Sequence, residues 1–220
     1  MQTLASMLPR FELPSAEVRA KADAKAREIE AAERRYAAER RIRQAGIPAR
    51  YREARIADAC EPVRRWAADV AAGSADSLML KGPNGTGKTT QACAALMALA
   101  GSMRGEFATM TGILAEVKAT YSGPGSERQA VARWRNVPLL VVDDLGKENV
   151  TPFALAMMYA VIDGRYQAMR PTVYTTNDDS ASLFAKLSAG GDEATAKSIV
   201  SRLADARQVR IGGADRRLAR

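Results

Sequence analysis

The sequence contains no histidine and only two cysteines. Structural zinc sites usually take four cysteine or histidine ligands, so we expect this protein to bind no zinc. Without imidazole groups, acid–base catalysis by histidine and histidine-based catalytic triads are excluded as well. Cys60 and Cys93 stand far apart in the sequence, and we expect two small buried thiols rather than a disulfide.

Long apolar runs are absent too. No stretch approaches the ~18 consecutive apolar residues of a membrane-spanning helix. The opening residues, MQTLASMLPRFELP, lack the charged-then-apolar pattern of a secretory signal. We therefore expect a cytoplasmic protein with no membrane partner. The chain of 220 residues is long enough for one sizeable α/β domain with an appendage.

Excess positive charge is confined to the two ends of the chain, whose net charge is +8. Residues 1–50 carry 11 Lys/Arg against 7 Asp/Glu, and residues 202–220 carry 6 against 2, whereas the middle carries 16 of each. This distribution suits contact with nucleic acid or with an acidic protein surface. Basic ends that only keep a protein soluble have the same composition, so charge alone leaves both readings open.

Residues 1–47 are predicted to form an N-terminal helical arm, and residues 48–220 a second domain. The stretch from Ser15 onward is rich in Ala, Glu, Arg and Lys, and Gly46 and Pro48 end the helix. Its apolar residues form only a thin stripe, so we expect an exposed arm or a surface for a partner. The stripe consists of Val18, Ala22, Ile29, Ala32 and Tyr36.

From residue 48 onward, short apolar runs alternate with helical patterns. This alternation predicts a three-layer αβα fold with a five-stranded parallel sheet and helices on both faces. The strands are expected at 77–80, 107–110, 138–142, 172–175 and 209–211. Helices are expected at 60–72, 89–99, 112–121, 153–169, 182–186 and 194–206, with one more ending near Trp134.

The stretch KGPNGTGKTT, residues 81–90, fits the pattern G-x-x-x-x-G-K-[ST] between a predicted strand and a predicted helix. Glycines allow backbone N–H groups to wrap around phosphates, and the following helix points its positive end toward them. We expect Lys88 to reach the β- and γ-phosphates of ATP, and the Thr89 hydroxyl to complete the shell of a Mg²⁺ ion. The predicted nucleotide-binding residues of this loop are Gly82, Pro83, Asn84, Gly85, Thr86, Gly87, Lys88, Thr89 and Thr90.

An apolar run, Leu139–Val142, delivers two adjacent carboxylates at the edge of the sheet where ligands bind in open α/β folds. We expect Asp143 to hold Mg²⁺ together with Thr89, and Asp144 to polarise the attacking water. In the alternative reading, Asp144 only caps the next element. The catalytic reading is favoured because two buried acids side by side are costly without a cation.

These motifs, together with TTN at residues 175–177, resemble the DnaC/IstB branch of the AAA+ ATPases, and most closely the DnaC-type replicative helicase loaders. The resemblance covers roughly residues 45–217. Further stretches that carry it are GIPARY (46–51), TGILAEVKATY (111–121), YAVIDGRYQAMRPTVYTTN (159–177), SIVSRL (198–203) and GGADRR (212–217).

The resemblance implies an AAA+-like P-loop NTPase without a large lid domain, and it implies roles for three further residues. Asn177 matches the sensor 1 position, where it would orient the attacking water. Arg202 matches the arginine finger that reaches the nucleotide of a neighbouring subunit. Arg217 matches sensor 2, although Arg216 stands where a tyrosine is common, so these two arginines are hard to tell apart.

The resemblance also implies partners. ATP would promote a homo-oligomer, because an arginine finger acts between subunits. The N-terminal arm would dock on the replicative DNA helicase. Single-stranded DNA would lie along the segment 118–135, with Tyr121, Arg128, Arg133 and Arg135 as candidate contacts, although the same residues suit a solvated helix face.

The implied function is an ATP-dependent loader of the replicative helicase onto single-stranded DNA, with weak, DNA-stimulated, Mg²⁺-dependent ATP hydrolysis as the switch. One alternative is a transposition helper ATPase that binds DNA and a transposase. A P-loop kinase is disfavoured, because residues 178–201 offer no arginine-rich lid. An ATP-holding switch without turnover stays open, because the acid pair is Asp-Asp where many relatives have Asp-Glu.

Overall fold

The structure of the protein is a computed structural model that describes residues 15–215. The chain divides into two compact units, Met1–Tyr36 and Ala37–Arg220. Within the described range, no helix is both long and apolar enough to cross a membrane.

The predicted N-terminal helix is α1 (Ala16–Gln44), whose residues up to Tyr36 belong to the first unit. Every residue from 15 to 36 is exposed. Ion pairs one turn apart, such as Lys21–Glu17 at 3.1 Å and Arg34–Glu30 at 2.6 Å, stabilise such a helix by about 0.2–0.5 kcal/mol each. With no buried face, this part of α1 contributes nothing to a hydrophobic core.

The last turns of α1 belong to the second unit. The Arg41 guanidinium donates to the carbonyl oxygens of Ala100 and Gly101 at 2.8 and 3.1 Å, and Ile42 packs against buried residues of that unit. Residues 37–44 are thus tied to the second unit by their own contacts, although they continue the same helix.

The second unit contains the predicted five-stranded parallel sheet, in the order β2-β3-β4-β1-β5. The strands are β1 (Leu78–Lys81), β2 (Gly105–Thr109), β3 (Leu139–Leu145), β4 (Thr172–Thr176) and β5 (Arg207–Arg210). The predicted strands match them within a few residues. Because every strand runs the same way, all the carboxyl ends lie at one edge of the sheet and all the amino ends at the other.

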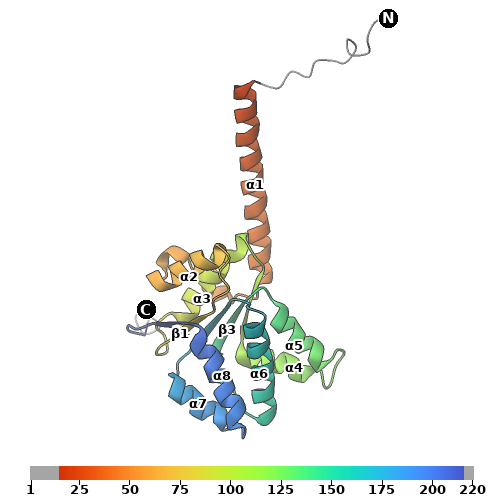
Figure 1. Cartoon of the computed structure of the whole chain (residues 1–220), viewed down its shortest axis with the longest axis vertical. Coiled ribbons are helices and arrows are strands. Elements are labelled where there is room, and N and C mark those ends of the chain that lie inside the picture. The colour runs from red at the N-terminus through yellow and green to blue at the C-terminus, as the bar shows by residue number, and fades with distance from the viewer. Residues whose placement is uncertain (1–14, 216–220) are drawn as a thin grey trace, which may run out of the picture. The chain divides into compact units, whose positions relative to one another are not determined.

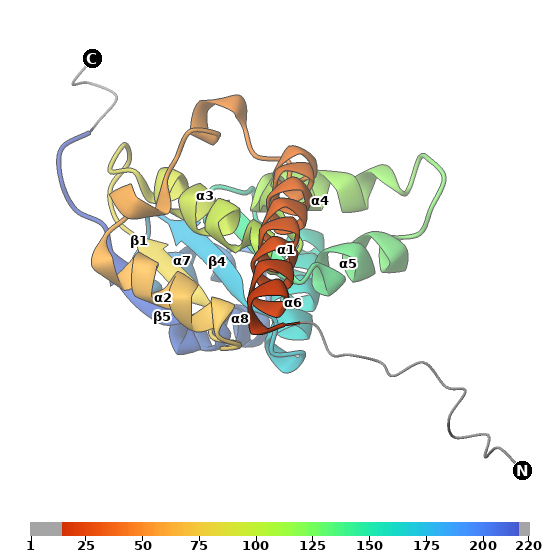
Figure 2. The same cartoon turned by 90° about the horizontal axis from the view of Figure 1, so that it is seen from above.

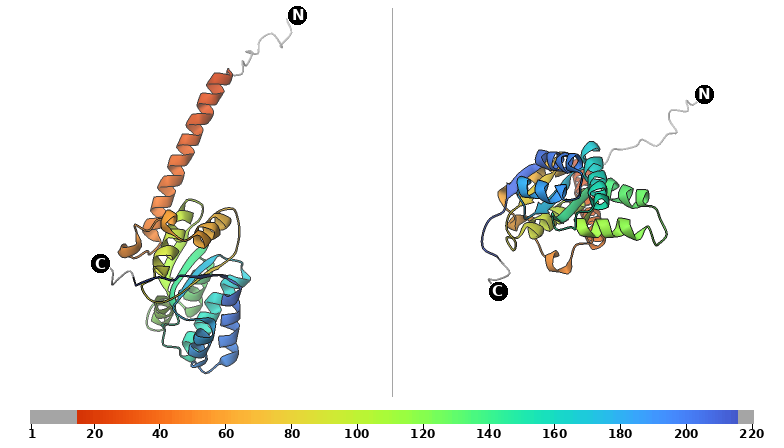
Figure 3. Two further views of the ribbon diagram at one scale, coloured as in Figure 1. Left: turned by 90° about the vertical axis from the view of Figure 1, so that its left-hand side faces the viewer. Right: turned by 90° about the horizontal axis from the view of Figure 1, so that it is seen from below.

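Helices cover both faces of the sheet, which confirms the three-layer αβα prediction (Figure 1). One face carries α2 (Glu61–Ala71) and α3 (Lys88–Ala98), which lie over β1 and β4 in Figure 2. The other face carries α4 (Met110–Ala119), α5 (Glu127–Asn136), α6 (Pro152–Gln167), α7 (Ser180–Ser188) and α8 (Glu193–Asp205). Figure 3 shows the α2–α3 layer and the α7–α8 layer on opposite sides of the strands. Three short 3₁₀ turns were not predicted: η2 (Ala49–Tyr51), η3 (Ile56–Asp58) and η4 (Leu99–Gly101).

Alternation along the strands divides the core into two clusters. On β1, Leu78 and Leu80 pack with α2 and α3, whereas Met79 packs with the helices of the opposite face. Successive side chains of a strand point to opposite faces, so a fully apolar strand serves both layers. Cys93 is buried in the α2–α3 cluster, and burial raises the pKa of its thiol to about 12. The two cysteines are free, as predicted, but only Cys93 is buried, whereas Cys60, at the start of α2, is half-buried. Cys93 is expected to be unreactive.

Arg165 on α6 is buried, with 1% of its surface exposed, and it pairs with no carboxylate among residues 15–215. Its guanidinium donates to the Thr172 hydroxyl at 2.8 Å and to the carbonyl oxygens of Trp134, Val137 and Pro171 at 2.9, 2.7 and 3.0 Å. It thereby joins the end of α5 and the start of β4 to α6. Burial lowers the pKa of Arg165 to about 10, so the side chain stays charged at neutral pH.

Replacing Arg165 should destabilise the protein strongly. Arg165→Met leaves several buried carbonyl groups without a donor, and each lost partner costs about 1–3 kcal/mol. We expect a loss of about 3–5 kcal/mol in the free energy of unfolding, measured by urea denaturation. Arg128→Met, at an exposed position of α5, is the matched control and should change it by under about 0.5 kcal/mol. Equal midpoints for the two variants would contradict the structural role of Arg165.

Candidate nucleotide-binding site

The glycine-rich loop lies between the end of β1 at Lys81 and the start of α3 at Lys88. Gly85 and Gly87 have φ angles of +74° and +96°, in the left-handed region that favours glycine. At Gly82 a Cβ atom would lie 2.0 Å from the carbonyl oxygen of Ile211, so only glycine allows the loop to pass this close to the segment after β5. The loop therefore has the backbone conformation that a phosphate cradle needs.

The Lys88 side chain is buried and crosses the loop. Its ammonium group donates to the carbonyl oxygens of Gly82 and Pro83, at 2.8 and 2.7 Å, and to Oδ1 of Asn177, at 2.7 Å. The structure thus brings together Lys88 and Asn177, which are predicted from motifs 89 residues apart. Asn177 directly follows β4, at the carboxyl edge of the sheet.

Thr89, Asp143 and Thr175 form a second cluster at this edge. The Thr89 hydroxyl donates to the Asp143 carboxylate at 2.9 Å, and the Thr175 hydroxyl donates to the same oxygen at 2.6 Å. Burial raises the pKa of the Asp143 carboxyl, the adjacent Asp144 raises it further, and the two threonine hydrogen bonds oppose this shift. A bound cation would relieve the cost of keeping this carboxylate charged.

These oxygens fit Mg²⁺. The ion prefers oxygen ligands, and in nucleotide sites it takes one or two from the protein and the rest from water and phosphate. In the described part of the chain there is no group of three or more His, Cys, Asp and Glu side chains that would hold a metal alone. A buried carboxylate next to a hydroxyl, beside a phosphate-binding loop, is the set that a magnesium–nucleotide complex requires.

The Asp144 side chain points in a different direction from that of Asp143, although the two residues are adjacent in the sequence. Its φ angle is +58°, and the ladder between β3 and β4 shifts register between Val142 and Leu145. The backbone N–H of Asp144 donates to the Thr175 hydroxyl at 3.0 Å. Its carboxylate lines the cavity beside the loop and pairs with Lys147 at 2.9 Å. The left-handed backbone thus separates one buried acid from one that reaches the cavity.

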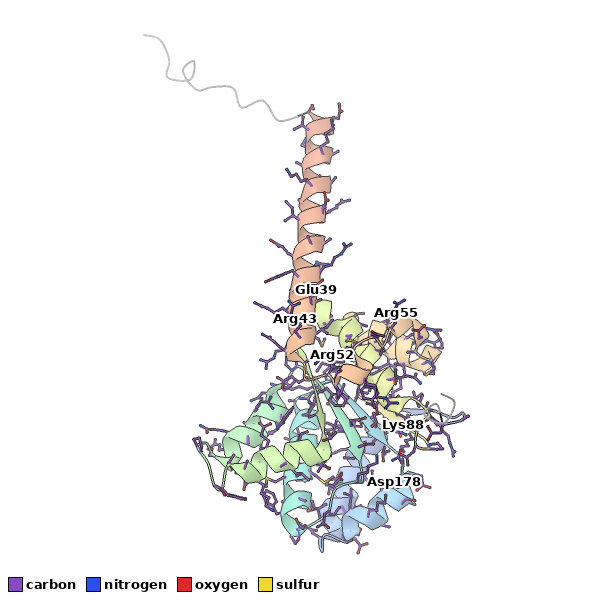
Figure 4. The ribbon with its side chains drawn as sticks, turned by 180° about the vertical axis from the view of Figure 1, so that it is seen from behind. Glu39, Arg43, Arg52, Arg55, Lys88 and Asp178 are labelled. Atoms are coloured by element: carbon purple, nitrogen blue, oxygen red, sulfur yellow. The ribbon has the colours of Figure 1, made fainter. Side chains whose placement is uncertain are left out.

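The cavity beside the loop has a volume of about 390 Å³. The glycine-rich loop, Asp144 and Asn177 line one side, and a segment that we did not predict to be functional lines the other. The backbone N–H of Cys60 donates to Oε1 of the buried Gln91 at 2.9 Å, which ties the end of this segment to α3. Figure 4 shows Arg55 of this segment and Lys88 of the loop on the same side of the domain. The added residues are Arg50, Tyr51, Glu53, Ala54, Arg55, Asp58 and Ala59.

A signal for this wall was present in the sequence. The stretch ARYREARIAD, residues 49–58, has charged residues at half of its positions and lies just before α2. We used GIPARY only as a mark of resemblance, and the two 3₁₀ turns that fold the segment back over the loop have no clear sequence pattern.

Arg202 does not line this cavity. Arg202 lies in the last turn of α8, shortly before β5 begins at Arg207. Arg207 pairs in register with Leu78, the first residue of β1, so β5 starts at the amino edge of the sheet. Arg202 is therefore at the amino edge of the sheet, opposite the glycine-rich loop. It forms an ion pair with Asp163 on α6. Arg217 and Arg216 lie outside the described residues.

The candidate DNA contacts of segment 118–135 are all exposed, but they are not equivalent. Arg133 pairs with the buried Glu106 at 2.8 Å and with Glu116 at 3.2 Å, so it is already engaged. Arg135 packs over Gly164 of α6, where a Cβ atom would lie 2.0 Å from its Nε. Tyr121 is 62% exposed, although its hydroxyl donates to Glu127, and Arg128 is exposed, so these two stay candidates.

The family model of IstB-like ATP binding proteins matches residues 50–220. The chain belongs to this family. The match begins at Arg50, on the newly found wall of the cavity, and includes the loop, both acids and Asn177. The chain is thus an IstB-like ATP-binding domain of the AAA+ P-loop class, and the site described above lies within the matched range.

Among curated relatives, the IstB-like chain is similar to the replicative helicase loader DnaC of Escherichia coli K12. The two are 31% identical over 111 residues, which cover 49% of this chain and 44% of the relative. DnaC of Shigella flexneri matches to the same extent. The chain therefore spans less than half the length of the curated relatives it matches.

Solved structures agree on the fold. The crystal structure of DnaI has a TM-score of 0.65 at 21% identity and covers 75% of this chain and 94% of that one. The DnaC helicase loader has a TM-score of 0.63 at 23% identity and covers 75% and 100%. The replication initiator DnaA, bound to AMPPCP and single-stranded DNA, has a TM-score of 0.60 at 15% identity and covers 76% and 51%. At these identities the likeness establishes the AAA+ fold and no more.

The raised pKa of Asp143 predicts a stability change with pH in the absence of magnesium. The folded protein binds a proton at Asp143 at a pH where the unfolded chain does not, so this group lowers stability as the pH rises through its folded pKa. Asp143→Asn should therefore be more stable than the parent at pH 7 in EDTA, and the gain should shrink as the pH falls toward the ordinary aspartate pKa. Thermal melts across this pH range test it, with the exposed Asp205→Asn as control. A gain that does not change with pH would contradict the charge argument.

Proposed function

We propose that this protein loads the replicative DNA helicase onto single-stranded DNA, using ATP binding and hydrolysis as the switch. The proposal rests on the 31% identity to a replicative helicase loader over 111 residues. The chain also belongs to a family of ATP-binding proteins. Such a protein would act in the cytoplasm, where the helicase and the DNA are.

ATP would bind with its phosphates on the glycine-rich loop and its base toward the wall formed by residues 50–59. Lys88 would exchange its carbonyl partners for the β- and γ-phosphates, since a charge-assisted bond to phosphate is the stronger one. Thr89 and Asp143 would hold Mg²⁺, which neutralises phosphate charge when bound. The contact between Lys88 and Asn177 supports a γ-phosphate position that both side chains would reach.

Hydrolysis requires an attacking water and a group to polarise it. Asp144 is the candidate base, because its carboxylate reaches the cavity, and Asn177 would orient the water. Asp144 is paired with Lys147, and a base neutralised by an ammonium group is weaker. The pair supports slow turnover, as expected of a timer rather than a metabolic enzyme.

Assembly would complete the site. Arg202 lies at the sheet edge opposite its own cavity, so it can serve only the nucleotide of another copy. ATP would then favour a homo-oligomer, and hydrolysis would release it. Within such an assembly, Tyr121 and Arg128 are the proposed contacts to single-stranded DNA. Arg217 remains the proposed sensor 2.

The N-terminal arm is the proposed helicase-docking region. Residues 15–36 are exposed throughout, and they include three large apolar side chains, those of Val18, Ile29 and Tyr36. A helix of this kind can pair with a helix of a partner along a narrow stripe.

A transposition helper ATPase is the second candidate, favoured by the IstB-like family model itself. The two functions share the ATP site and differ in the protein partner. Capture by the host's transposase rather than by its replicative helicase would establish the second function in place of the first.

Deleting residues 1–36 should abolish helicase binding and leave ATP binding intact. This deletion is preferable to a longer one, because the residues from Ala37 onward make contacts within the second unit. We expect immobilised replicative helicase to retain the full chain in the presence of ATP and Mg²⁺ and to lose the deleted one. ATP affinity, measured with a fluorescent analogue, should change less than about twofold, equivalent to about 0.4 kcal/mol. Equal capture of both chains would refute the docking role.

Mixing two inactive variants should restore ATP turnover if the site is shared between copies. Lys88→Ala should lose ATP binding but keep its arginine, whereas Arg202→Ala should keep ATP binding but lack the arginine. Alone, each should hydrolyse ATP at least about 100-fold more slowly than the parent, since an arginine finger contributes about 10³–10⁵ in rate in other NTPases. An equimolar mixture should recover part of the activity, measured as phosphate release. Turnover by Arg202→Ala alone would remove the finger assignment.

A further inference from the structure

One face of α6 encloses the guanidinium of Arg202. Tyr159, Asp163 and Tyr166 lie at spacings of four and three residues, which places them on the same side of the helix. Asp163 accepts from Nε of Arg202, and the guanidinium carbon lies 5.1 and 5.8 Å from the ring centres of Tyr159 and Tyr166. Two aromatic rings and one carboxylate therefore fix the plane of this side chain.

The hydrogen bonds that Arg202 makes use only some of its N–H groups, so the others can bind a ligand. A guanidinium has five N–H donors. Nε donates to Asp163, Nη1 donates to the carbonyl oxygen of Ser198 at 3.0 Å, and Nη2 donates to the Tyr159 hydroxyl at 3.4 Å. Each terminal nitrogen thus has one further N–H with no partner among the described residues. Two such groups on one fork match two oxygens of a phosphate.

Asp163 is placed to hold the arginine rather than to join a surface network. Only 8% of it is exposed, and its second oxygen accepts from Nε2 of Gln167 at 2.6 Å. Both carboxylate oxygens are therefore fixed from within α6 and α8. A buried carboxylate that is hydrogen-bonded on both oxygens keeps its partner in one orientation.

We propose that Asp163 is a positioning residue for ATP hydrolysis: it holds Nε of Arg202 so that the two terminal nitrogens point toward the nucleotide of a neighbouring copy. This inference rests on the proposed function, because it takes Arg202 as the arginine that completes the site of another subunit. Asp163 does not touch the nucleotide and acts only through Arg202.

The positioning role predicts that Asp163→Asn loses turnover when it supplies the arginine, but not when it supplies the ATP site. Asp163→Asn keeps the shape of the side chain but removes its charge, so Arg202 loses its orientation while the subunit's own ATP site is unchanged. Mixed with Arg202→Ala, which has a site and no arginine, Asp163→Asn should restore about tenfold less turnover than Lys88→Ala does, because misplacing a reacting group by ~1 Å can cost about 10²-fold. Mixed with Lys88→Ala, which supplies an intact arginine, Asp163→Asn should restore as much turnover as the mixture of Lys88→Ala with Arg202→Ala does. The loss should appear in kcat, with KM for ATP unchanged.

Two further variants complete the test. Tyr159→Phe removes only the hydroxyl that accepts from Nη2 and should show a smaller loss in the same direction, so it replaces Asp163→Asn if that variant does not fold. Asp205→Asn is the matched control, because Asp205 is an exposed acid that lines the same cavity as Arg202 and makes no hydrogen bond to it in the structure. Asp205→Asn should both supply its arginine to another copy and hydrolyse ATP in its own site as the parent does.

The outcomes distinguish a failure of the positioning role of Asp163 from a failure of the proposed function. If Lys88→Ala and Arg202→Ala fail to complement each other, the shared site fails and the role of Asp163 fails with it. If they complement each other but Asp163→Asn supplies its arginine as well as Lys88→Ala does, only the positioning role is overturned. A loss in both directions would make Asp163 merely structural, and a gain in turnover would make it a restraint on Arg202. Either result refutes the proposal.

Discussion

The buried carboxylate of Asp143 is the point on which the rest of the site depends. It accepts from Thr89 on α3 and from Thr175 on β4, and it belongs to β3, so one group ties together the three elements that surround the phosphate loop. The same burial that makes it a good structural link makes its charge costly, as the raised pKa indicates. A carboxylate in this state favours a cation, so a magnesium–nucleotide complex bound here, as we propose, would be coupled to the packing of the sheet edge.

The sequence was sufficient for the fold because its local signals agree with one another. The apolar run of β3, the glycines before α3 and the alternation of strands and helices all specify a parallel sheet, and the five strands lie where we predicted them. The meeting of Lys88 and Asn177 could also be anticipated, because parallel strands deliver their carboxyl ends to one edge. These features follow from periodicity and topology, which a sequence records directly.

Other parts of the site could not be predicted, for physical reasons. The left-handed backbone of Asp144 separates it from Asp143, and no local pattern distinguishes two adjacent aspartates. The wall around Arg55 depends on a tertiary hydrogen bond between Cys60 and Gln91, which lie 31 residues apart in the sequence. The enclosure of Arg202 by α6 depends on helix packing across the domain. The last two of these features are contacts between residues far apart in the sequence, which no pattern within a single segment records.

The common direction of the five strands gives the molecule a polarity that extends to any assembly built on it. The cavity opens at the carboxyl edge and Arg202 lies at the amino edge, so copies that share a site must stack head to tail, and the contact surface on one copy differs from that on the next. If Arg202 acts between copies as proposed, an open row would leave a nucleotide that no arginine reaches at one end and an arginine without a nucleotide at the other. Only a closed ring makes every subunit equivalent. A row that stays open therefore has two distinct ends, and one face of each remains available to a different protein.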